Sequence, residues 1–393
     1  MVTVYSKPGG LTTFNIKDGF VEALLRGYKL GFLKDVDYRS ILQCDNLSDV
    51  KLNLQETDYG NFCAEVQQVS PSIIREKAME KLVAEFEYLR SQADYPLAQF
   101  LDYITYDYMI DNVMLILKAT LNNPNVDIFS LVKQAHPLGQ FEESVLKSIC
   151  AFENSAKGYG ELYQSVLIDT PIGKYFAKFL EEESAKSAQN ANDVQNLLAE
   201  LSATRLESSL RKLYLEDFAH FCETLGGETA EIMLNLLKAR ADATAINITL
   251  NSFDTQLNQI NTRKSQRKPL YPSMGFLYPE GTEKLSEVGD ENDLASVLRT
   301  YPIYEEIFKS HQGQSNEQTI DDAFYEREVE LNEMAFEGQF QYAAFYSYVR
   351  LKEQEIRNLV WICECIVQRR KDRTSDHFVP IFSKEAKFRN RNR

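Results

Sequence analysis

Two pairs of closely spaced residues, one histidine with a cysteine and one of two cysteines, could provide ligands for a metal ion. His220 is separated by one residue from Cys222, as Cys363 is from Cys365. Both pairs lie in segments with helical periodicity, where residues two apart point about 200° away from each other. Neither pair therefore converges on one ion. None of the four histidines stands in an H-E-x-x-H or E-x-x-H arrangement, the usual helical zinc and di-iron signatures. We expect core thiols, with no metal and no other cofactor.

Acidic pairs are the second candidates for chemistry. Asp290 and Asp293 lie three residues apart, and Asp321 and Asp322 are adjacent. All-α enzymes that handle prenyl substrates hold Mg²⁺ with acid pairs, but DDAFY lacks the second acid of the D-D-x-x-D pattern. Acids are also favoured in the first turn of a helix by the helix dipole. The Asp321/Asp322 cluster thus has two interpretations, a helix N-terminus or the Mg²⁺ site of an all-α enzyme.

Nucleotide and nucleic-acid binding are not indicated. The sequence has no G-x-x-x-x-G-K-[ST] motif, and the pair Gly158 and Gly160 lacks a third glycine and a preceding strand. The formal net charge is −15, whereas neutralising phosphates requires clustered cations. The six cysteines are scattered and no signal peptide is evident, so we expect free thiols in a reducing, cytosolic compartment.

Helical periodicity dominates the chain, so the expected fold class is all-α. The expected helices cover 16–30, 73–92, a segment from Pro96 onward, 205–224, 228–250, 321–349 and 351–370. The longest apolar runs, VMLIL and LVWIC, are far shorter than the roughly 20 residues of a membrane helix. The segment 261–281 contains three prolines and is expected to be a loop.

An internal repeat is visible in three places. Similar blocks surround Thr57, Thr170 and Thr300, and each is followed by a helical segment in which an asparagine opens an apolar run, at Asn112, Asn247 and Asn358. An acid stands five residues before each asparagine, at Asp107, Asp242 and Glu353. Three copies of a helical unit explain this order, with a polar insertion at 181–205 in the second copy. Glu353 and Arg357 are spaced for an ion pair on one helix.

A resemblance rests on blocks in one order along almost the whole chain. The most specific is KEQEIRNLVWICECI (352–366), together with TDYGNF (57–62). Other blocks are NIKDGFVEALLRGYKLGFL (15–33), HPLGQFE (136–142), CETLGGETAEIM (222–233) and LYPEG (277–281). On these blocks the sequence resembles the family of subunit d of V-type proton ATPases. A free-standing helical scaffold, the third hypothesis, is disfavoured by the block at 352–366.

The resemblance implies a specific architecture. It predicts three similar helical lobes with approximate threefold symmetry, forming a funnel or tripod. The expected lobes span 1–135, 136–260 and 261–382, followed by a basic, disordered tail at 383–393. The stretch 351–370 then becomes the last core helix of the third lobe, with Leu359, Ile362, Cys363 and Ile366 inward and Trp361 against a neighbouring helix.

The resemblance also implies a function. It predicts a non-catalytic rotor subunit that links the central stalk, subunits D and F, to the membrane proteolipid ring and transmits torque for proton transport. Other membrane-sector subunits are further expected partners, and the membrane is reached only through the ring. The expected place is the cytosolic face of acidic organelles such as vacuoles, lysosomes and endosomes. Since Cys44 and Cys365 both lie in family blocks, a disulfide between them is a further possibility.

Overall fold

The computed structural model describes residues 11–60, 62–122, 131, 134–139, 141, 170–186, 203–305 and 320–383. Across these residues the regular structure is helical and no strand occurs, so the predicted all-α class is confirmed. No helix in these ranges is long and apolar enough to cross a membrane. The chain divides into two compact units, which are described separately. Unit 1 comprises Met1–Leu101, Cys222–Leu236 and Asn292–Arg393, and unit 2 comprises Asp102–Phe221 and Leu237–Glu291.

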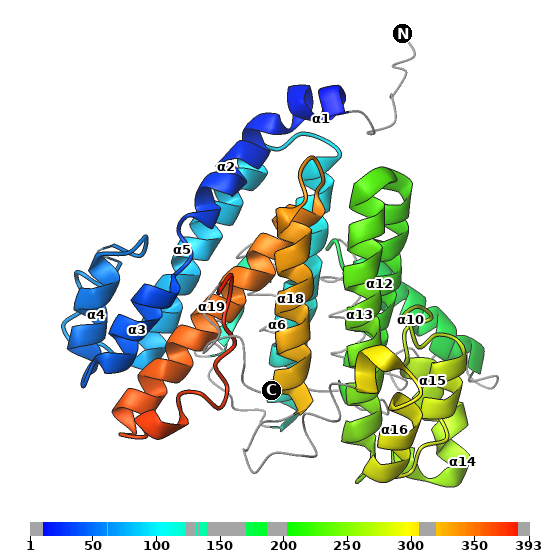
Figure 1. Ribbon diagram of the computed structural model, residues 1–393. Helices are drawn as coiled ribbons and strands as arrows, with labels where there is room; N and C mark the ends of the chain where they lie inside the picture. The colour runs from blue at the N-terminus through cyan, green and yellow to red at the C-terminus, as the bar shows by residue number, and fades with distance from the viewer. Residues whose placement is uncertain are drawn as a thin grey trace. The chain divides into compact units, whose positions relative to one another are not determined.

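Unit 1 is built around one long helix, α19 (Ala343–Val367). The other helices of this unit are α1 (Leu11–Lys17), α2 (Gly19–Lys29), α3 (Asp35–Gln43), α4 (Leu47–Gln55), α5 (Pro71–Gln92), α16 (Glu291–Leu298) and α18 (Ile320–Glu337). α19 packs against α18, α5, α4 and α2, as Figure 1 shows in part. Residues 343–349 are all buried, so the first two turns of α19 are surrounded on every side. The aromatic-rich stretch 336–350 therefore supplies mainly internal packing.

Unit 2 contains most of three long helices that also extend into unit 1. Its residues lie in α6 (Leu97–Asn122) from Asp102 onward, α10 (Gly173–Lys186), α12 (Ala203–Leu225) as far as Phe221, α13 (Gly227–Ser252) from Leu237 onward, α14 (Ile260–Thr262) and α15 (Glu280–Leu285). An aromatic stack joins α6 to α12: the ring of Tyr103 lies 5.2 Å from Phe218 and 4.6 Å from Phe221, centroid to centroid, in both cases nearly parallel. All three rings are buried, so the stack is part of the core of this unit.

Three expected boundaries are wrong. The predicted helices 321–349 and 351–370 are instead α18 and α19, with a break at 338–342. Phe340 has a positive φ of 60°, and the side chain of Gln341 bonds to the oxygen of Ala335 and the amide of Ala344, which closes one helix and opens the next. The predicted helix 16–30 is interrupted at Asp18. The predicted loop 261–281 contains a π-helical turn, Arg263–Arg267, and short helices on both sides of it.

Three long helices recur in the same sequence context. α6, α13 and α19 have 26, 26 and 25 residues, and each directly follows another long helix, α5, α12 or α18. Asn112, Asn247 and Asn358 lie in these three helices. The helix pairs fit the repeat that the sequence predicts, while the three lobes and their symmetric arrangement stay predictions.

Candidate functional site: asparagine clamps and buried charge clusters

Asn112 clamps a loop onto α6. This buried side chain donates from Nδ2 to the carbonyl oxygens of His136 and Gly139, both at 2.9 Å, and accepts from the backbone amide of His136 at 2.6 Å. The loop lies so close that a Cβ added to Gly139 would stand 2.3 Å from the carbonyl carbon of Tyr108. Only glycine fits there, which explains the glycine of the block HPLGQFE.

Asn358 makes the same clamp on α19. Its Nδ2 donates to the carbonyl oxygen of Val379 at 2.6 Å, and its Oδ1 accepts from the amide of Val379 at 3.1 Å. One amide side chain can satisfy both polar groups of one backbone residue because it carries a donor and an acceptor in one plane. Both clamped residues precede a proline, Pro137 and Pro380. Asn247 is half-buried in α13, and Tyr271-Pro272 follows it at the spacing that separates Asn112 from His136.

The repeated threonines form turns. The hydroxyls of Thr57 and Thr300 each donate at 2.7 Å to the carbonyl oxygen three residues earlier, at the end of a helix. The carbonyl oxygen of Thr57 accepts from Gly60 at 3.0 Å, and that of Thr170 accepts from Gly173 at 2.9 Å. The three threonines therefore lie in local turns at helix ends, and none of these bonds creates a reactive group.

The three acids that precede the repeated asparagines have three different kinds of binding partner. Asp107 is buried and binds arginines. Asp242, also buried, accepts the backbone amides of Phe276 at 2.8 Å and Leu277 at 3.2 Å. Glu353 pairs with Arg350 at 2.8 Å, so the expected pair with Arg357 is not formed. Sequence spacing thus found these positions but not their partners.

A buried ion pair in unit 1 joins three of the sequence blocks. Lys352 and Glu355, one turn apart on α19, are 3% and 0% exposed and lie 2.7 Å apart. Glu355 also accepts from the amide of Leu33 at 2.6 Å and from the hydroxyl of Tyr59 at 2.8 Å, while Lys352 donates to the oxygen of Gly31 at 3.2 Å. Each charge is therefore paired and hydrogen-bonded, as burial requires. We call these residues the Lys352 cluster.

A second carboxylate extends this polar core. Tyr348 of α19 donates to Glu85 of α5, and Lys81 pairs with Glu85 at 3.1 Å and with Asp58 at 3.0 Å. Burial, followed by the neighbouring charge of Glu85, raises the pKa of Tyr348 well above its usual range. The phenol therefore remains a neutral donor that ties α19 to α5.

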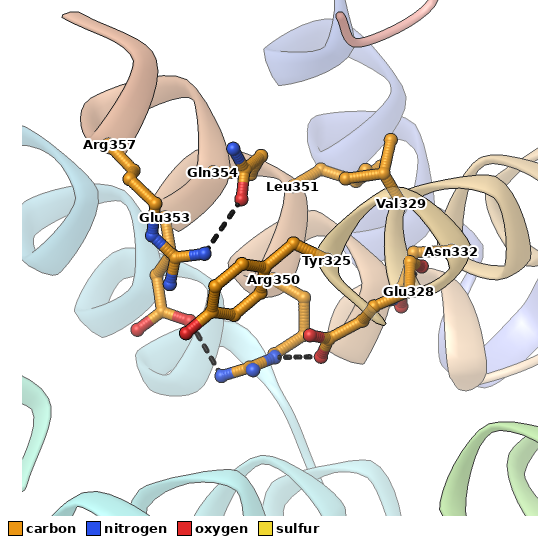
Figure 2. A pocket seen from close by; sticks show the side chains of 9 residues that line it. All are labelled: Tyr325, Glu328, Val329, Asn332, Arg350, Leu351, Glu353, Gln354 and Arg357. Carbon is orange, nitrogen blue, oxygen red and sulfur yellow. Dashed lines mark hydrogen bonds and ion pairs between the residues drawn. The ribbon is translucent and has the colours of Figure 1, made fainter. Parts of the chain in front are cut away.

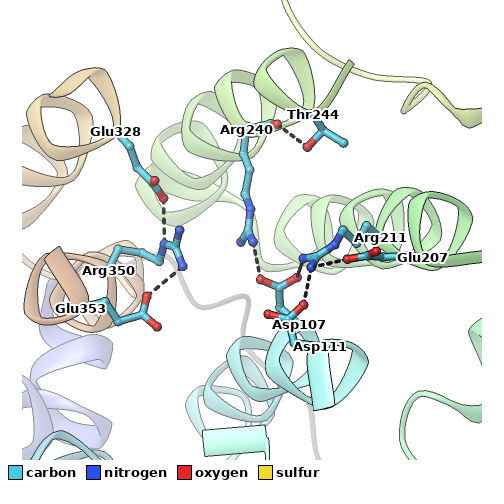
Figure 3. A network of polar contacts seen from close by, with 9 residues as sticks. All are labelled: Asp107, Asp111, Glu207, Arg211, Arg240, Thr244, Glu328, Arg350 and Glu353. Atoms are coloured by element: carbon cyan, nitrogen blue, oxygen red, sulfur yellow. Dashed lines mark hydrogen bonds and ion pairs between the residues drawn. The ribbon is translucent and has the colours of Figure 1, made fainter. Parts of the chain in front are cut away.

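A partly exposed cluster in unit 2 ties together α6, α12 and α13 (Figure 3). Asp107 binds Arg240 and also Arg211, the latter at 3.3 Å; Arg211 further binds Asp111 and, at 3.1 Å, Glu207. Burial, then the charge of Asp107, raises the pKa of Asp111 to about 6. We call these residues the Arg211 cluster. Lys118 also binds Glu207, so two arginines and one lysine match the three carboxylates when all are ionised.

A small polar pocket lies between α18 and α19 (Figure 2). Arg350 lies between Glu328 at 2.7 Å and Glu353 at 2.8 Å, and the guanidinium of Arg357 stacks 3.7 Å from the ring centre of Tyr325. Its two arginines and two glutamates balance, so the lining favours neither an anion nor a metal ion. The side chains of Asp321 and Asp322 lie outside the described residues. Both positions fall in the first turn of α18.

The last core helix has the predicted inward face. Leu359, Ile362, Cys363 and Ile366 are buried. Trp361 contacts the segment after α19, and its expected packing against a neighbouring helix stays a prediction. Its indole nitrogen donates to the carbonyl oxygen of Thr374 at 3.2 Å and its ring meets His377 edge-on, so it anchors the segment after α19.

The cysteines of this helix are inert. Burial, the largest cause, raises the pKa of Cys363 to about 12 and that of Cys365 to about 11, so both remain thiols at neutral pH. Cys44 and Cys365 are buried and free, and their pairing stays a prediction. Within the described residues, no group of histidine, cysteine and acidic side chains is arranged to hold a metal. The Lys352 and Arg211 clusters tie elements of the fold together.

Comparison with known proteins assigns the family. The family model of the ATP synthase (C/AC39) subunit matches residues 21–377. The chain belongs to this family. It is 44% identical to V-type proton ATPase subunit d of Dictyostelium discoideum over 96% of this chain and 98% of that protein. It is also 44% identical to the probable V-type proton ATPase subunit d of Oryza sativa, over 95% and 99%, and 35% identical to subunit d of Saccharomyces cerevisiae, over 93% and 97%.

These relatives confirm the resemblance to subunit d. They are named as subunit d of V-type proton ATPase, and membership of this family of accessory subunits confirms the expectation of a non-catalytic protein. The Lys352 cluster and the arginine partners of Asp107 were not predicted from the sequence. A lysine and a glutamate one turn apart within the apolar helix 351–370 were the available signal for the first.

Proposed function

We propose that this chain is a non-catalytic rotor subunit of a V-type proton pump. In this role it links the central stalk, subunits D and F, to the membrane proteolipid ring and passes torque between them. Membership of the subunit d family is the observation that carries the proposal. The other proposed partners are membrane-sector subunits, and the proposed place is the cytosolic face of acidic organelles such as vacuoles, lysosomes and endosomes.

The interior of the chain supports a torque-transmitting role. A body that passes torque must deform little, and densely packed helices have low compressibility. Within unit 1, the Lys352 cluster fixes two turns to α19. Within unit 2, the Arg211 cluster ties three helices. We further propose that the three helix pairs α5–α6, α12–α13 and α18–α19 are the cores of three lobes, at 1–135, 136–260 and 261–382.

Affinity purification tests membership of the pump. The tagged chain is purified from mild-detergent membrane extracts and its partners are identified by mass spectrometry. We expect proteolipid and central-stalk subunits in stable amounts. A soluble, monomeric chain without these partners would overturn the proposal.

A cross-linking experiment tests the rotor role itself. Joining the chain covalently to the proteolipid ring should leave ATP hydrolysis intact, because both parts turn together. Joining it to a stationary subunit should stop hydrolysis until the link is cut. Equal inhibition by both links would show that the chain does not turn with the ring.

A further inference from the structure

Two buried polar atoms on α18 and α19 have no hydrogen-bond partner among the described residues. They are Oδ1 of Asn332 and Oγ of Ser347, and the two residues are 1% and 0% exposed. Asn332 uses its Nδ2 to donate to the carbonyl oxygen of Glu328 at 2.7 Å, so its Oδ1 points away from that carbonyl. Burying a polar atom without a hydrogen bond lowers stability, so we expect both atoms to bind a partner.

The two residues lie at matching positions of one helix pair. α18 and α19 follow each other across the short break at 338–342, and Arg350 of α19 ties them by an ion pair with Glu328 of α18 at 2.7 Å. Asn332 stands four residues after Glu328, and Ser347 stands three residues before Arg350. Each is therefore about one turn closer to the break than the ion pair is. The two atoms without partners belong to neighbouring parts of the two helices.

A small space lies beside Asn332. This residue lines the polar pocket between the two helices, together with Leu351 and Gln354 of α19 (Figure 2). Ser347 precedes Leu351 by one turn and shares its helical face, so it lies at the same side of α19 as the pocket lining. The pocket has room for about one water molecule. A metabolite or a side chain of a partner is too large for it.

The chemistry of the lining selects a neutral ligand that can donate a hydrogen bond. The two arginines and two glutamates of the pocket balance, so an ion of either sign gains no net attraction there. The Oδ1 of Asn332 can only accept, whereas the hydroxyl of Ser347 can donate or accept. A water molecule has no charge, fits the space, and can donate to the first atom while it accepts from the second.

We propose that one ordered water molecule bridges Asn332 of α18 and Ser347 of α19. It donates to Oδ1 of Asn332, accepts from the hydroxyl of Ser347, and directs its second hydrogen into the polar pocket. Because both protein atoms are shielded from bulk solvent, this water exchanges slowly and acts as a fixed link between the two helices. The inference goes beyond the proposed function, since it concerns the isolated chain and needs no partner subunit.

A crystal structure of the purified full-length chain tests the bridge directly. We expect one solvent peak within hydrogen-bond distance of both Oδ1 of Asn332 and Oγ of Ser347. A map that resolves other buried waters but shows no peak at this place would overturn the proposal. A direct hydrogen bond between the two side chains would overturn it as well, because it would leave no place for the water.

Two substitutions test the same water in solution. The magnetic relaxation dispersion of water oxygen-17 counts long-lived internal waters, and Asn332→Leu, which removes the acceptor and fills the space, should lower that count by about one. Ser347→Ala leaves the water without its donor and should shorten its residence time.

Thr249→Val is the control for these measurements. The hydroxyl of Thr249 is also buried, but it donates to the carbonyl oxygen of Ala245 at 2.8 Å and shares a hydrogen bond of 2.7 Å with the hydroxyl of Tyr271. Its loss should therefore leave the number of internal waters unchanged. An unchanged count in folded Asn332→Leu would overturn the proposal. If Asn332→Leu does not fold, Ser347→Ala decides, and a residence time equal to that of wild type would overturn the bridge.

Discussion

The Lys352 cluster and the Arg211 cluster both join helices and turns through ion pairs, but they differ in how far they are exposed to water. Both tie elements together by matched charges, but Lys352 and Glu355 are 3% and 0% exposed, whereas Arg211 and Asp111 are 29% and 39% exposed. Water can replace a lost partner in the second cluster and not in the first. The buried cluster should therefore depend strictly on each of its members, while the exposed one should tolerate loss and respond to pH and salt.

The largest expected effect is in unit 1. Lys352→Met removes the only cation paired with Glu355 among the described residues and leaves a buried carboxylate without its counter-charge. We expect the free energy of unfolding of the purified chain, measured in urea, to fall by about 3–5 kcal/mol. Lys77→Met, which breaks the exposed pair Lys77–Glu80, is the control and should lower the free energy of unfolding far less. Equal losses for Lys352→Met and Lys77→Met would show that burial does not make the Lys352–Glu355 pair more important for stability than an exposed pair.

Removing an asparagine clamp should lower the free energy of unfolding less than removing Lys352, because the clamp groups are uncharged. Asn358→Ala leaves the amide and carbonyl of Val379 without their partner, and Val379 is only 3% exposed. We expect a loss of about 2–3 kcal/mol in unfolding free energy. Asn112→Ala should cost a comparable amount, because half-buried His136 can bond to water instead but the buried carbonyl oxygen of Gly139 also loses its donor. The same urea titrations check both values, and a loss below about 1 kcal/mol for either variant would contradict the role of the clamps.

Periodicity predicted the long helices because each needs an apolar face along its length. The expected 73–92, 205–224 and 228–250 correspond closely to α5, α12 and α13. The break at 338–342 was missed because it depends on Phe340 adopting a positive φ and on the Gln341 side chain, neither of which alters the apolar pattern. The loop expected at 261–281 was partly wrong because Arg267, fully buried, is held by the carbonyl oxygens of Leu285, Ser286 and Val288.

The candidate site was only half predictable. The repeat located Asn112 and Asn358, because an asparagine at the start of an apolar run is unusual. It did not locate His136 and Val379, because a backbone partner 24 or 21 residues away carries no side-chain signal. Lys352 and Glu355 have the spacing of an ordinary surface pair. Their burial follows from contacts with Leu33, which is 322 residues from Glu355 along the chain.

A third substitution tests how far partial exposure of the Arg211 cluster reduces the loss of unfolding free energy. Arg240→Met removes one of the two arginines from Asp107, which keeps Arg211. We expect a loss of about 1–2 kcal/mol in unfolding free energy, below that of Lys352→Met. The loss should shrink in 1 M salt, because exposed charges are screened over about 3 Å there. The urea titration is repeated at low and high salt. A salt-independent loss would show that Asp107 is as isolated from water as Glu355.

The smallest effect is a change with pH. The folded pKa of Asp111 is about 6, above its ordinary value of 3.8, so the folded state favours the protonated carboxyl. The stabilisation from this group is complete below pH 4 and is lost as the pH rises through 6. Asp111→Asn fixes a neutral side chain that can still accept from Arg211. Relative to wild type, the variant should gain stability between pH 4 and pH 7, seen as a rising difference between the two thermal midpoints.

Asp217→Asn is the matched control. Burial raises the pKa of that carboxyl, but hydrogen bonds from Lys174 and Tyr175 outweigh burial and lower the pKa below its ordinary value. Its stability relative to wild type should change mainly below pH 4, where the wild-type carboxylate takes up its proton, and stay nearly constant between pH 4 and pH 7. A flat difference for Asp111→Asn would mean that water reaches the carboxylate freely and that the Arg211 cluster does not sense pH.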